Sequence, residues 1–269
     1  MSGLVVVPGY TRRFARQAGD WIPALVVFVA GIAAWEGAIV AFDIQKFLLP
    51  KPSDIALSCW DQRGTLWPAG WYTFREALGG FVIGSLGGMA VATVVGRFRS
   101  LGTALMPIAI AANAIPIIAF APIFNAWFDP LSPNSKIAIA AVLCFFPVMV
   151  NTLRGLTSVS PRQIELMRSY AASEVTVWRR VRVPTALPYV FTALKVASVL
   201  AMIGAVVGEY FGGSYDALGV LIRSKAQILD FETAWAGILV ASVLGIVLYL
   251  AVSISERLLV RWSPDLRDS

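Results

Sequence analysis

The chain has 269 residues, of which 58% are hydrophobic and only 14% are charged, and its mean hydropathy is +0.73. A soluble domain carries about a quarter charged residues, so this composition excludes an ordinary soluble domain and indicates a polytopic membrane protein. We expect an all-α fold that forms a single transmembrane domain over residues 1–269.

The composition also excludes several kinds of chemistry. The sequence contains no histidine, which removes the commonest general base and most zinc sites, so we expect no catalytic residue, metal or cofactor. No lysine follows a glycine, so the chain has no Walker A loop. The net charge of +6 comes from arginines beside apolar segments, which indicates membrane orientation rather than nucleic-acid binding.

Six apolar segments are long enough to cross a bilayer. They run from about Trp21 to Phe42, Tyr72 to Val95, Leu101 to Phe128, Ser135 to Leu153, Tyr189 to Phe211 and Thr233 to Leu259. Residues 1–20 are expected to be a cytoplasmic N-terminal segment, and residues 43–70 a polar, proline-containing loop. Prolines within 101–128 predict a kinked or broken third segment.

Two segments carry glycines at every fourth position. Gly80, Gly84 and Gly88 recur in the second, and Gly204, Gly208 and Gly212 recur in the fifth. Glycines at this spacing form a flat ridge along one face of a helix, so the sequence predicts close helix packing at both ridges.

The segment between the fourth and fifth crossings, residues 154–187, is basic and helix-forming. Ser160 can cap a helix whose first position is Pro161, and Ser173 can start a second one. We expect a break near Ala171 and Ala172, with Pro184 and Pro188 ending the second helix.

This segment resembles the EAA loop of the permease subunits of bacterial ABC importers. That loop has a glutamate and two alanines, then a glycine, an isoleucine and a Leu-Pro pair at fixed intervals. Glu165, Ala171, Val181 and Val183-Pro184 stand at the matching positions. Because alanine replaces the glycine at position 171, we expect another residue near the turn to adopt the left-handed conformation.

Two shorter stretches, Leu48 to Ser53 and Phe145 to Thr152, resemble the branch of these permeases that handles sulfonates, nitrate and taurine. Relatives of that branch handle pyrimidine precursors and riboflavin. The substrate stays open, although the spans contain no arginine cluster for a small dense anion, which favours an uncharged or heteroaromatic solute.

The resemblance implies a type I importer permease with a cytoplasmic coupling helix. Its partners would be a second permease copy, two cytosolic ATP-binding subunits, an extracytoplasmic solute-binding protein and the lipid bilayer. The residues implied to couple to the ATPase are Glu165, Leu166, Met167, Arg168, Ser169, Tyr170, Ala171, Ala172, Ser173 and Pro184.

The positive-inside rule places both termini and residues 154–187 in the cytoplasm of a cell with an inner membrane. Fourteen arginines then lie inside against seven basic residues outside, with Lys195 left out as intramembrane. Lys136 is counted among the seven outside.

Five polar residues are candidates for the solute path because polar groups are costly in lipid. They are Glu36, Asn113, Asn125, Asn151 and Glu209. Hydrogen bonding between helices explains the asparagines equally well, and Glu209 is expected near the outer mouth, as part of a gate or a binding-protein contact.

Two other classes remain open. An ion-gradient-driven carrier would need an intramembrane carboxylate, for which Glu36 is the only candidate in this interpretation. A membrane-embedded enzyme is disfavoured, because the chain has neither histidine nor a paired-carboxylate motif.

Overall fold

The computed structural model describes residues 10–98, 107, 111, 116–260 and 262. Within these residues every regular element is helical, as the composition predicts. The helices are α1 (Tyr10–Ala41), α2 (Pro52–Asp61), α3 (Arg63–Arg97), η1 (Ile117–Phe120), α5 (Ala121–Phe128), α6 (Pro133–Thr157), α7 (Pro161–Ser169), α8 (Glu174–Val177), η2 (Trp178–Arg182), α9 (Val183–Phe211), α10 (Leu218–Gln227) and α11 (Phe231–Leu259).

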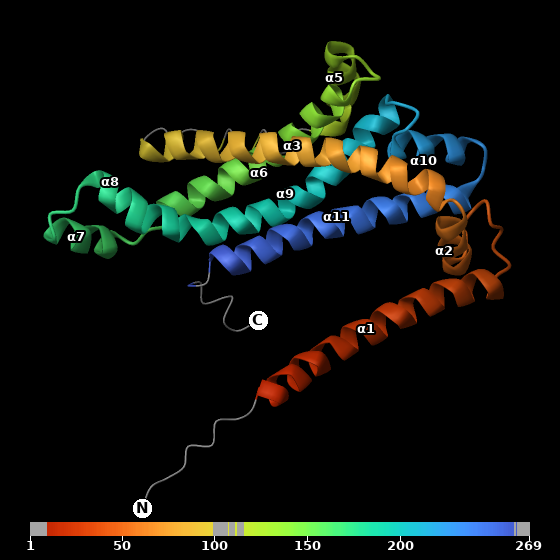
Figure 1. The fold of residues 1–269 in the computed structure, drawn as a ribbon, viewed down its shortest axis with the longest axis horizontal. Helices are drawn as coiled ribbons and strands as arrows, with labels where there is room; N and C mark the ends of the chain where they lie inside the picture. The colour runs from red at the N-terminus through yellow and green to blue at the C-terminus, as the bar shows by residue number, and fades with distance from the viewer. Residues whose placement is uncertain (1–9, 99–106, 108–110, 112–115, 261, 263–269) are drawn as a thin grey trace, which may run out of the picture.

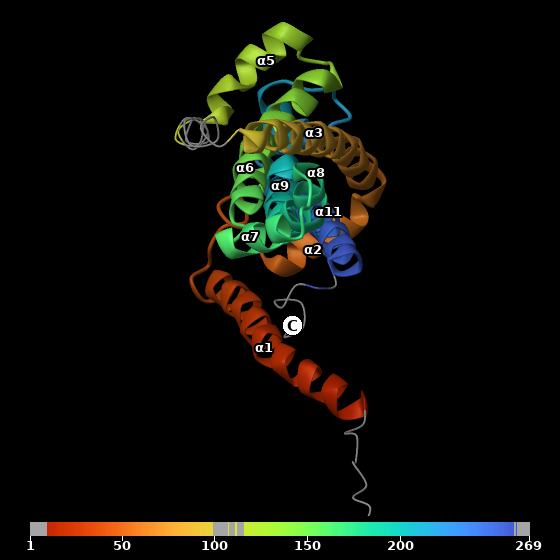
Figure 2. The ribbon, with the colours of Figure 1, turned by 90° about the vertical axis from the view of Figure 1, so that its left-hand side faces the viewer.

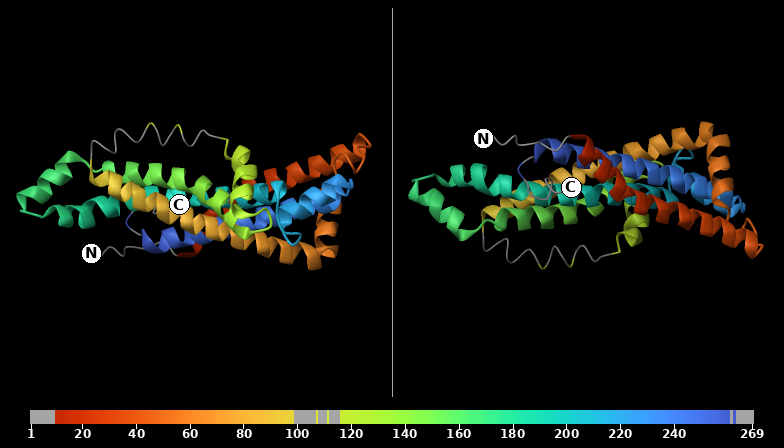
Figure 3. Two further views of the ribbon diagram at one scale, coloured as in Figure 1. Left: turned by 90° about the horizontal axis from the view of Figure 1, so that it is seen from above. Right: turned by 90° about the horizontal axis from the view of Figure 1, so that it is seen from below.

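Helices α3, α6, α9 and α11 form a bundle in which α6 packs against both α3 and α9 (Figure 1). Helix α1 lies apart from this bundle and approaches it at its C-terminal end (Figure 2). There the rings of Trp35 and Trp235 meet edge to face, with their centroids 5.5 Å apart. Both views in Figure 3 show the bundle helices running along one common long axis.

Five of the described helical segments are long and apolar enough to cross a membrane. They are Ile22–Ala41, Arg63–Arg97, Pro133–Thr157, Glu174–Phe211 and Phe231–Leu259. These correspond to the first, second, fourth, fifth and sixth predicted crossings. Of the third, the structure describes mainly η1 and α5, and most of residues 101–116, including Asn113, lie outside the described residues.

The expectation of a loop over residues 43–70 is wrong for most of that stretch. Residues 52–61 form α2, and α3 begins at Arg63, so the second crossing starts earlier than predicted. The prolines that suggest a loop are compatible with helix here. Pro52 stands in the first turn of α2. Backbone amides there have no partner within the helix, so the amide hydrogen that proline lacks costs no hydrogen bond.

Gly80, Gly84 and Gly88 of α3 and Gly204 and Gly208 of α9 contact α6, which confirms the predicted packing for these five, whereas Gly212 follows the end of α9 and lies against Asn125 and Pro130. A Cβ added to Gly88 of α3 would lie 2.6 Å from the carbonyl oxygen of Phe145, and one on Gly204 of α9 would lie 2.9 Å from the Cα of Ala140. Two side chains of α6 at this level, Ala140 and Cys144, are small and fully buried. The absence of side chains on the ridges therefore lets three backbones approach closely.

We expect Gly84→Ala to lower the free energy of unfolding by about 1–3 kcal/mol, because the added methyl group would collide with the backbone carbonyl of Ala141. Chemical unfolding in detergent measures the change. Gly87→Ala is the matched control: its Cβ would meet Phe145 at 3.5 Å, an ordinary contact. Equal destabilisation by the two substitutions would contradict the packing argument.

Candidate functional site

Helices α7 and α8 form a hairpin that projects from one end of the bundle and joins α6 to α9 (Figure 1). The caps predicted from the sequence are present at both starts. The Gln163 amide donates to Ser160 Oγ at 3.4 Å, and the Thr176 amide donates to Ser173 Oγ at 3.3 Å. Each serine side chain supplies an acceptor to an amide in the first turn of its helix, and the Gln163 amide also donates to the Ser160 carbonyl at 3.1 Å.

The turn between the two helices differs from the expected one. The Ala172 amide donates to the Met167 carbonyl at 3.0 Å and the Ala171 amide donates to the Arg168 carbonyl at 2.9 Å, which is a Schellman motif. Its left-handed residue is Ala171 itself, with φ of 53°, and not a neighbour. The hydrogen-bond pattern fixes which position must be left-handed, so the alanine accepts the strain that a glycine would avoid.

The prediction that Pro184 and Pro188 end the second helix is also wrong. The helical path continues from α8 through η2 into α9, and Pro188 lies inside α9. Pro184 lacks an amide hydrogen, and directly before it the Val183 amide bonds the Trp178 carbonyl, so the backbone forms one wider π-turn. The hairpin is therefore joined to the fifth crossing by an unbroken helix.

The hairpin exposes most of its surface. No residue of α7 is buried, Glu165 and Arg168 are exposed, and Leu166 and Tyr170 expose 56% and 76% of their surface. An ion pair of 3.6 Å between Arg168 and Glu174 joins the two arms. A short exposed helix that presents large apolar side chains is typical of a surface that contacts another protein.

The structure does not bring the described path candidates together at one cavity. Glu36 is half-buried and accepts a hydrogen bond of 2.7 Å from Ser53, and Asn151 is half-buried and donates to the Pro147 carbonyl at 2.9 Å. Asn125 is 4% exposed and lies beside Gly212.

Glu209 is fully buried and organises the end of the bundle opposite the hairpin. Its Oε2 accepts the Gly219 amide at 2.7 Å, and Thr73 Oγ1 accepts the Leu218 amide at 3.0 Å. These two side chains, from α9 and α3, cap the N-terminus of α10, which lacks a cap of its own. In this structure the Glu209 carboxylate therefore holds the N-terminus of α10 against α9.

Two charged residues that sequence reasoning missed surround Glu209. Glu76 of α3 and Lys136 of α6 are 4% and 1% exposed, and Lys136 lies close enough to Glu76 and Glu209 to interact with both charges. Two corrections follow. Lys136 is inside the bundle and not in an outer loop, and Glu36 is not the only carboxylate at membrane depth. Glu76 could have been found from the sequence, because it is a charged residue within a predicted apolar span.

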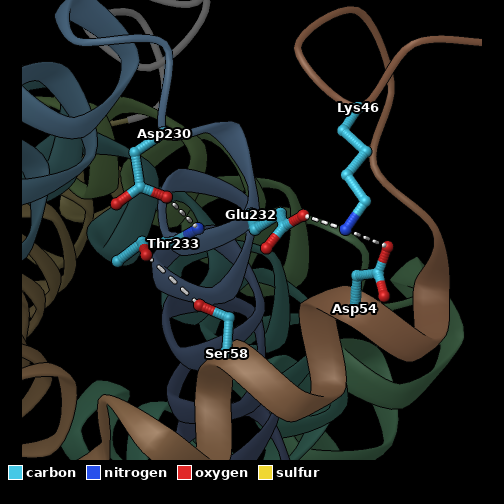
Figure 4. A network of polar contacts seen from close by, with 6 residues as sticks. All are labelled: Lys46, Asp54, Ser58, Asp230, Glu232 and Thr233. Atoms are coloured by element: carbon cyan, nitrogen blue, oxygen red, sulfur yellow. Dashed lines mark hydrogen bonds and ion pairs between the residues drawn. The ribbon is translucent and has the colours of Figure 1, made fainter.

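At the same end, a polar network ties the segment after α1 to the start of α11 (Figure 4). Lys46 Nζ lies 3.0 Å from Glu232 Oε1 and 3.4 Å from Asp54 Oδ2. The hydrogen bond to Glu232 and the two negative charges raise the pKa of Lys46. Ser58 and Thr233 pair through their hydroxyls at 3.2 Å, and Asp230 accepts the Thr233 amide, capping α11.

We expect Lys136→Met to lower the free energy of unfolding by about 1–3 kcal/mol, because it removes the donor to the carbonyls of Pro130 and Ser132 and a positive charge that acts on Glu76 and Glu209. Adding Glu76→Gln should recover part of the loss. Lys225→Met is the control, since its ion pair with Asp230 is partly exposed and should be worth about 1 kcal/mol or less. Chemical unfolding in detergent measures all three, and an unchanged stability of Lys136→Met would contradict the cluster's role.

Comparison with known proteins gives consistent matches. The family described as "Binding-protein-dependent transport system inner membrane component" matches residues 81–262. The riboflavin transport system permease protein of Chloroflexus aurantiacus is 31% identical over 93% of this chain and 94% of its own length. The formylaminopyrimidine transport permease protein of Halalkalibacterium halodurans is 34% identical over 81% of this chain and 87% of its own length.

A putative aliphatic sulfonates transport permease protein of Bacillus subtilis is 26% identical over 93% of this chain and 91% of its own length. Among solved structures, the crystal structure of an amino acid ABC transporter with histidines matches with a TM-score of 0.57 at 16% identity, covering 76% of this chain and 97% of that one. At that identity the match shows the fold alone.

Proposed function

Because this chain belongs to the family of binding-protein-dependent transport system inner membrane components, we propose that the exposed α7–α8 hairpin receives mechanical work from an ATP-binding subunit. The chain is the permease of an ABC transport system, a membrane component that acts with ATP-binding and solute-binding partners. The residues proposed to contact the ATP-binding subunit run from Glu165 to Ser173. Pro184 is proposed to shape the π-turn behind them.

The single observation that carries this proposal is the connection of the hairpin to the bundle. The hairpin presents Leu166 and Tyr170 to solvent, and both of its ends continue into membrane helices that touch each other. A Cβ on Gly155 of α6 would lie 2.8 Å from the Cα of Ala186 of α9, so α6 and α9 are in close contact directly behind the hairpin. A force on the hairpin therefore acts on both helices at once.

The proposed assembly contains two copies of this chain, two ATP-binding subunits and one extracytoplasmic solute-binding protein in the cell's inner membrane. The proposed orientation puts the hairpin and both termini in the cytoplasm. The basic residues at the hairpin end support it by the positive-inside rule, as do those in the last turns of α3 and α11. Closure of the ATP-binding subunits would then move two hairpins together and switch the helix packing between two states.

Of the path candidates, Glu36 and Asn151 are proposed to be accessible to solute, since both keep part of their surface exposed. Asn125 stays a proposed path residue, because its buried amide group has no hydrogen-bond partner within the described residues, and Glu209 is proposed to hold the bundle together instead. The competing carrier driven by an ion gradient has less support, because the buried carboxylate of Glu209 accepts the Gly219 amide and caps α10.

The proposed substrate is a small heteroaromatic solute. Two relatives named for such solutes, riboflavin and formylaminopyrimidine, share more identical residues with this chain than the sulfonate relative does. The described spans also offer no cluster of arginines at membrane depth that would suit a sulfonate.

Charge reversal at Glu165 tests the coupling role. We expect Glu165→Lys to insert into the membrane normally and to lower ATP-dependent uptake by roughly thirtyfold or more, the effect of about 2 kcal/mol lost at an interface hot spot. Uptake into proteoliposomes of the full transporter measures it. Arg257→Glu, an exposed charge reversal in the last turn of α11 and outside the hairpin, should leave uptake unchanged. Normal uptake by Glu165→Lys would contradict the proposed coupling role of the hairpin.

The solute-binding partner tests the substrate class. Riboflavin or formylaminopyrimidine at a hundredfold excess over Kd should stabilise it by about 2.7 kcal/mol, seen as a higher midpoint of thermal unfolding. Taurine and an alkanesulfonate serve as controls and should give no shift. A shift produced by the sulfonates alone would place the protein with the other branch.

A further inference from the structure

A cavity of about 320 Å³ opens behind the hairpin, between the C-terminal end of α3 and the α8–η2 segment. Its lining includes Thr93 and Arg97 from α3, and Glu174, Trp178 and Arg182 from the other side. The proposed coupling surface does not include this cavity, because its lining residues follow Ser173 or belong to α3. Its volume lies at the lower end of the range of small-molecule sites, about 300–1,000 Å³.

The charges around the cavity favour an anion. Arg97 and Arg182 both line it, while the one acidic group, Glu174, is paired at 3.6 Å with Arg168, which lies outside the lining. The positive charges of the two lining arginines are therefore not balanced within the cavity.

Arg182 is held in place by its neighbours. The π-turn brings Arg182 back over the face of Trp178, with the guanidinium carbon 5.7 Å from the ring centroid. One of its nitrogens, Nη1, donates to the Leu156 carbonyl at 3.5 Å, near the end of α6. Only one of five donors is used in this way, and Arg97 makes no ion pair or side-chain hydrogen bond within the described residues.

The surface next to Arg97 is apolar and exposed. Val94 and Phe98 stand three residues before Arg97 and one after it, and they expose 61% and 59% of their surface. At this end of a membrane helix such side chains face acyl chains, while a neighbouring arginine and tryptophan lie at headgroup depth. A ligand with a phosphate group and an apolar tail matches both parts of this surface.

We propose that this cavity binds a phosphate-bearing anion between Arg97 and Arg182, which in the membrane is the phosphodiester headgroup of an anionic lipid. Planar guanidinium groups bind phosphate oxygens through paired hydrogen bonds, and basic pockets between membrane helices on the cytoplasmic side suit anionic lipid headgroups. The inference rests on the proposed cytoplasmic placement of the hairpin. A bound headgroup would join α3 to the segment that leads from the hairpin into α9.

The test measures thermal unfolding of the purified full chain in a neutral detergent. Phosphatidylglycerol should raise the unfolding midpoint, whereas phosphatidylcholine should not. Arg97→Gln should weaken the apparent affinity for phosphatidylglycerol by about tenfold or more, the effect of losing one charge-assisted hydrogen bond. Substitution of Arg97 is preferred to substitution of Arg182, because Arg97 has no partner in the described structure whose loss would unfold the chain. Arg182→Lys, which keeps the charge and loses the paired geometry, should weaken binding as well.

Arg257→Gln is the matched control, since it removes an exposed arginine at the same end of the bundle outside the cavity. It should retain the full shift. Inorganic phosphate, added without lipid, separates the two sources. A shift of equal size that also depends on Arg97 would support the site and assign it to a free anion.

Three results would overturn the proposal: no shift with either probe, an undiminished lipid shift in Arg97→Gln, or an equal loss in Arg257→Gln. None of these measurements involves an ATP-binding subunit. Failure of this site and failure of coupling at Glu165 are therefore separate observations.

Discussion

The close approach of α3 and α9 to α6 is the constraint on which the rest of the structure depends. Glycines at every fourth position on the two outer helices leave no side chains between the backbones, so α6 is packed on both sides. Inside a membrane the hydrophobic effect does not drive helices together. Van der Waals contact between closely packed helices stabilises the bundle instead. The close packing also leaves charged side chains no route to water, so those at this interface must be compensated within the protein.

The buried charges follow from that constraint. Glu76, Lys136 and Glu209 come one from each of the three closely packed helices, and each is almost fully buried. Glu209 accepts a backbone amide of α10, and Lys136 donates to the carbonyls of Pro130 and Ser132. Glu209 and Lys136 thus have polar partners in the protein, whereas Oε2 of Glu76 has none among the described residues. The same groups fix the connections at this end of the bundle, together with the Lys46 network.

The two ends of the bundle differ in how tightly they are held. At one end the caps of α10, the Lys46 ion pairs and the buried Glu209 hold the helices together, while the other end carries a hairpin in which no residue of α7 is buried, and an ion pair of 2.8 Å between Lys195 and Glu256 joins α9 to α11 behind it. The unbroken helix from Glu174 to Phe211 links the two. In the proposed mechanism this arrangement lets the hairpin end move as a lever against a fixed opposite end. The cavity with Arg97 and Arg182 lies where such movement would change the distance between α3 and α9.

The sequence alone determined the class of protein, the five described crossings, the capping serines and the two glycine ridges. Each depends on local spacing: the length of an apolar run, a serine before a helix, or a residue repeated every helical turn. Only the tertiary structure decided that Lys136 and Glu76 face Glu209, because the rotation of a helix about its axis depends on its neighbours. Ala171 adopts the left-handed conformation because the closing hydrogen bonds of α7 select that position, and Pro184 continues a helix because a wider turn precedes it. In both cases backbone hydrogen bonding outweighed the preference of the single residue, and this balance exists only once the surrounding chain has folded.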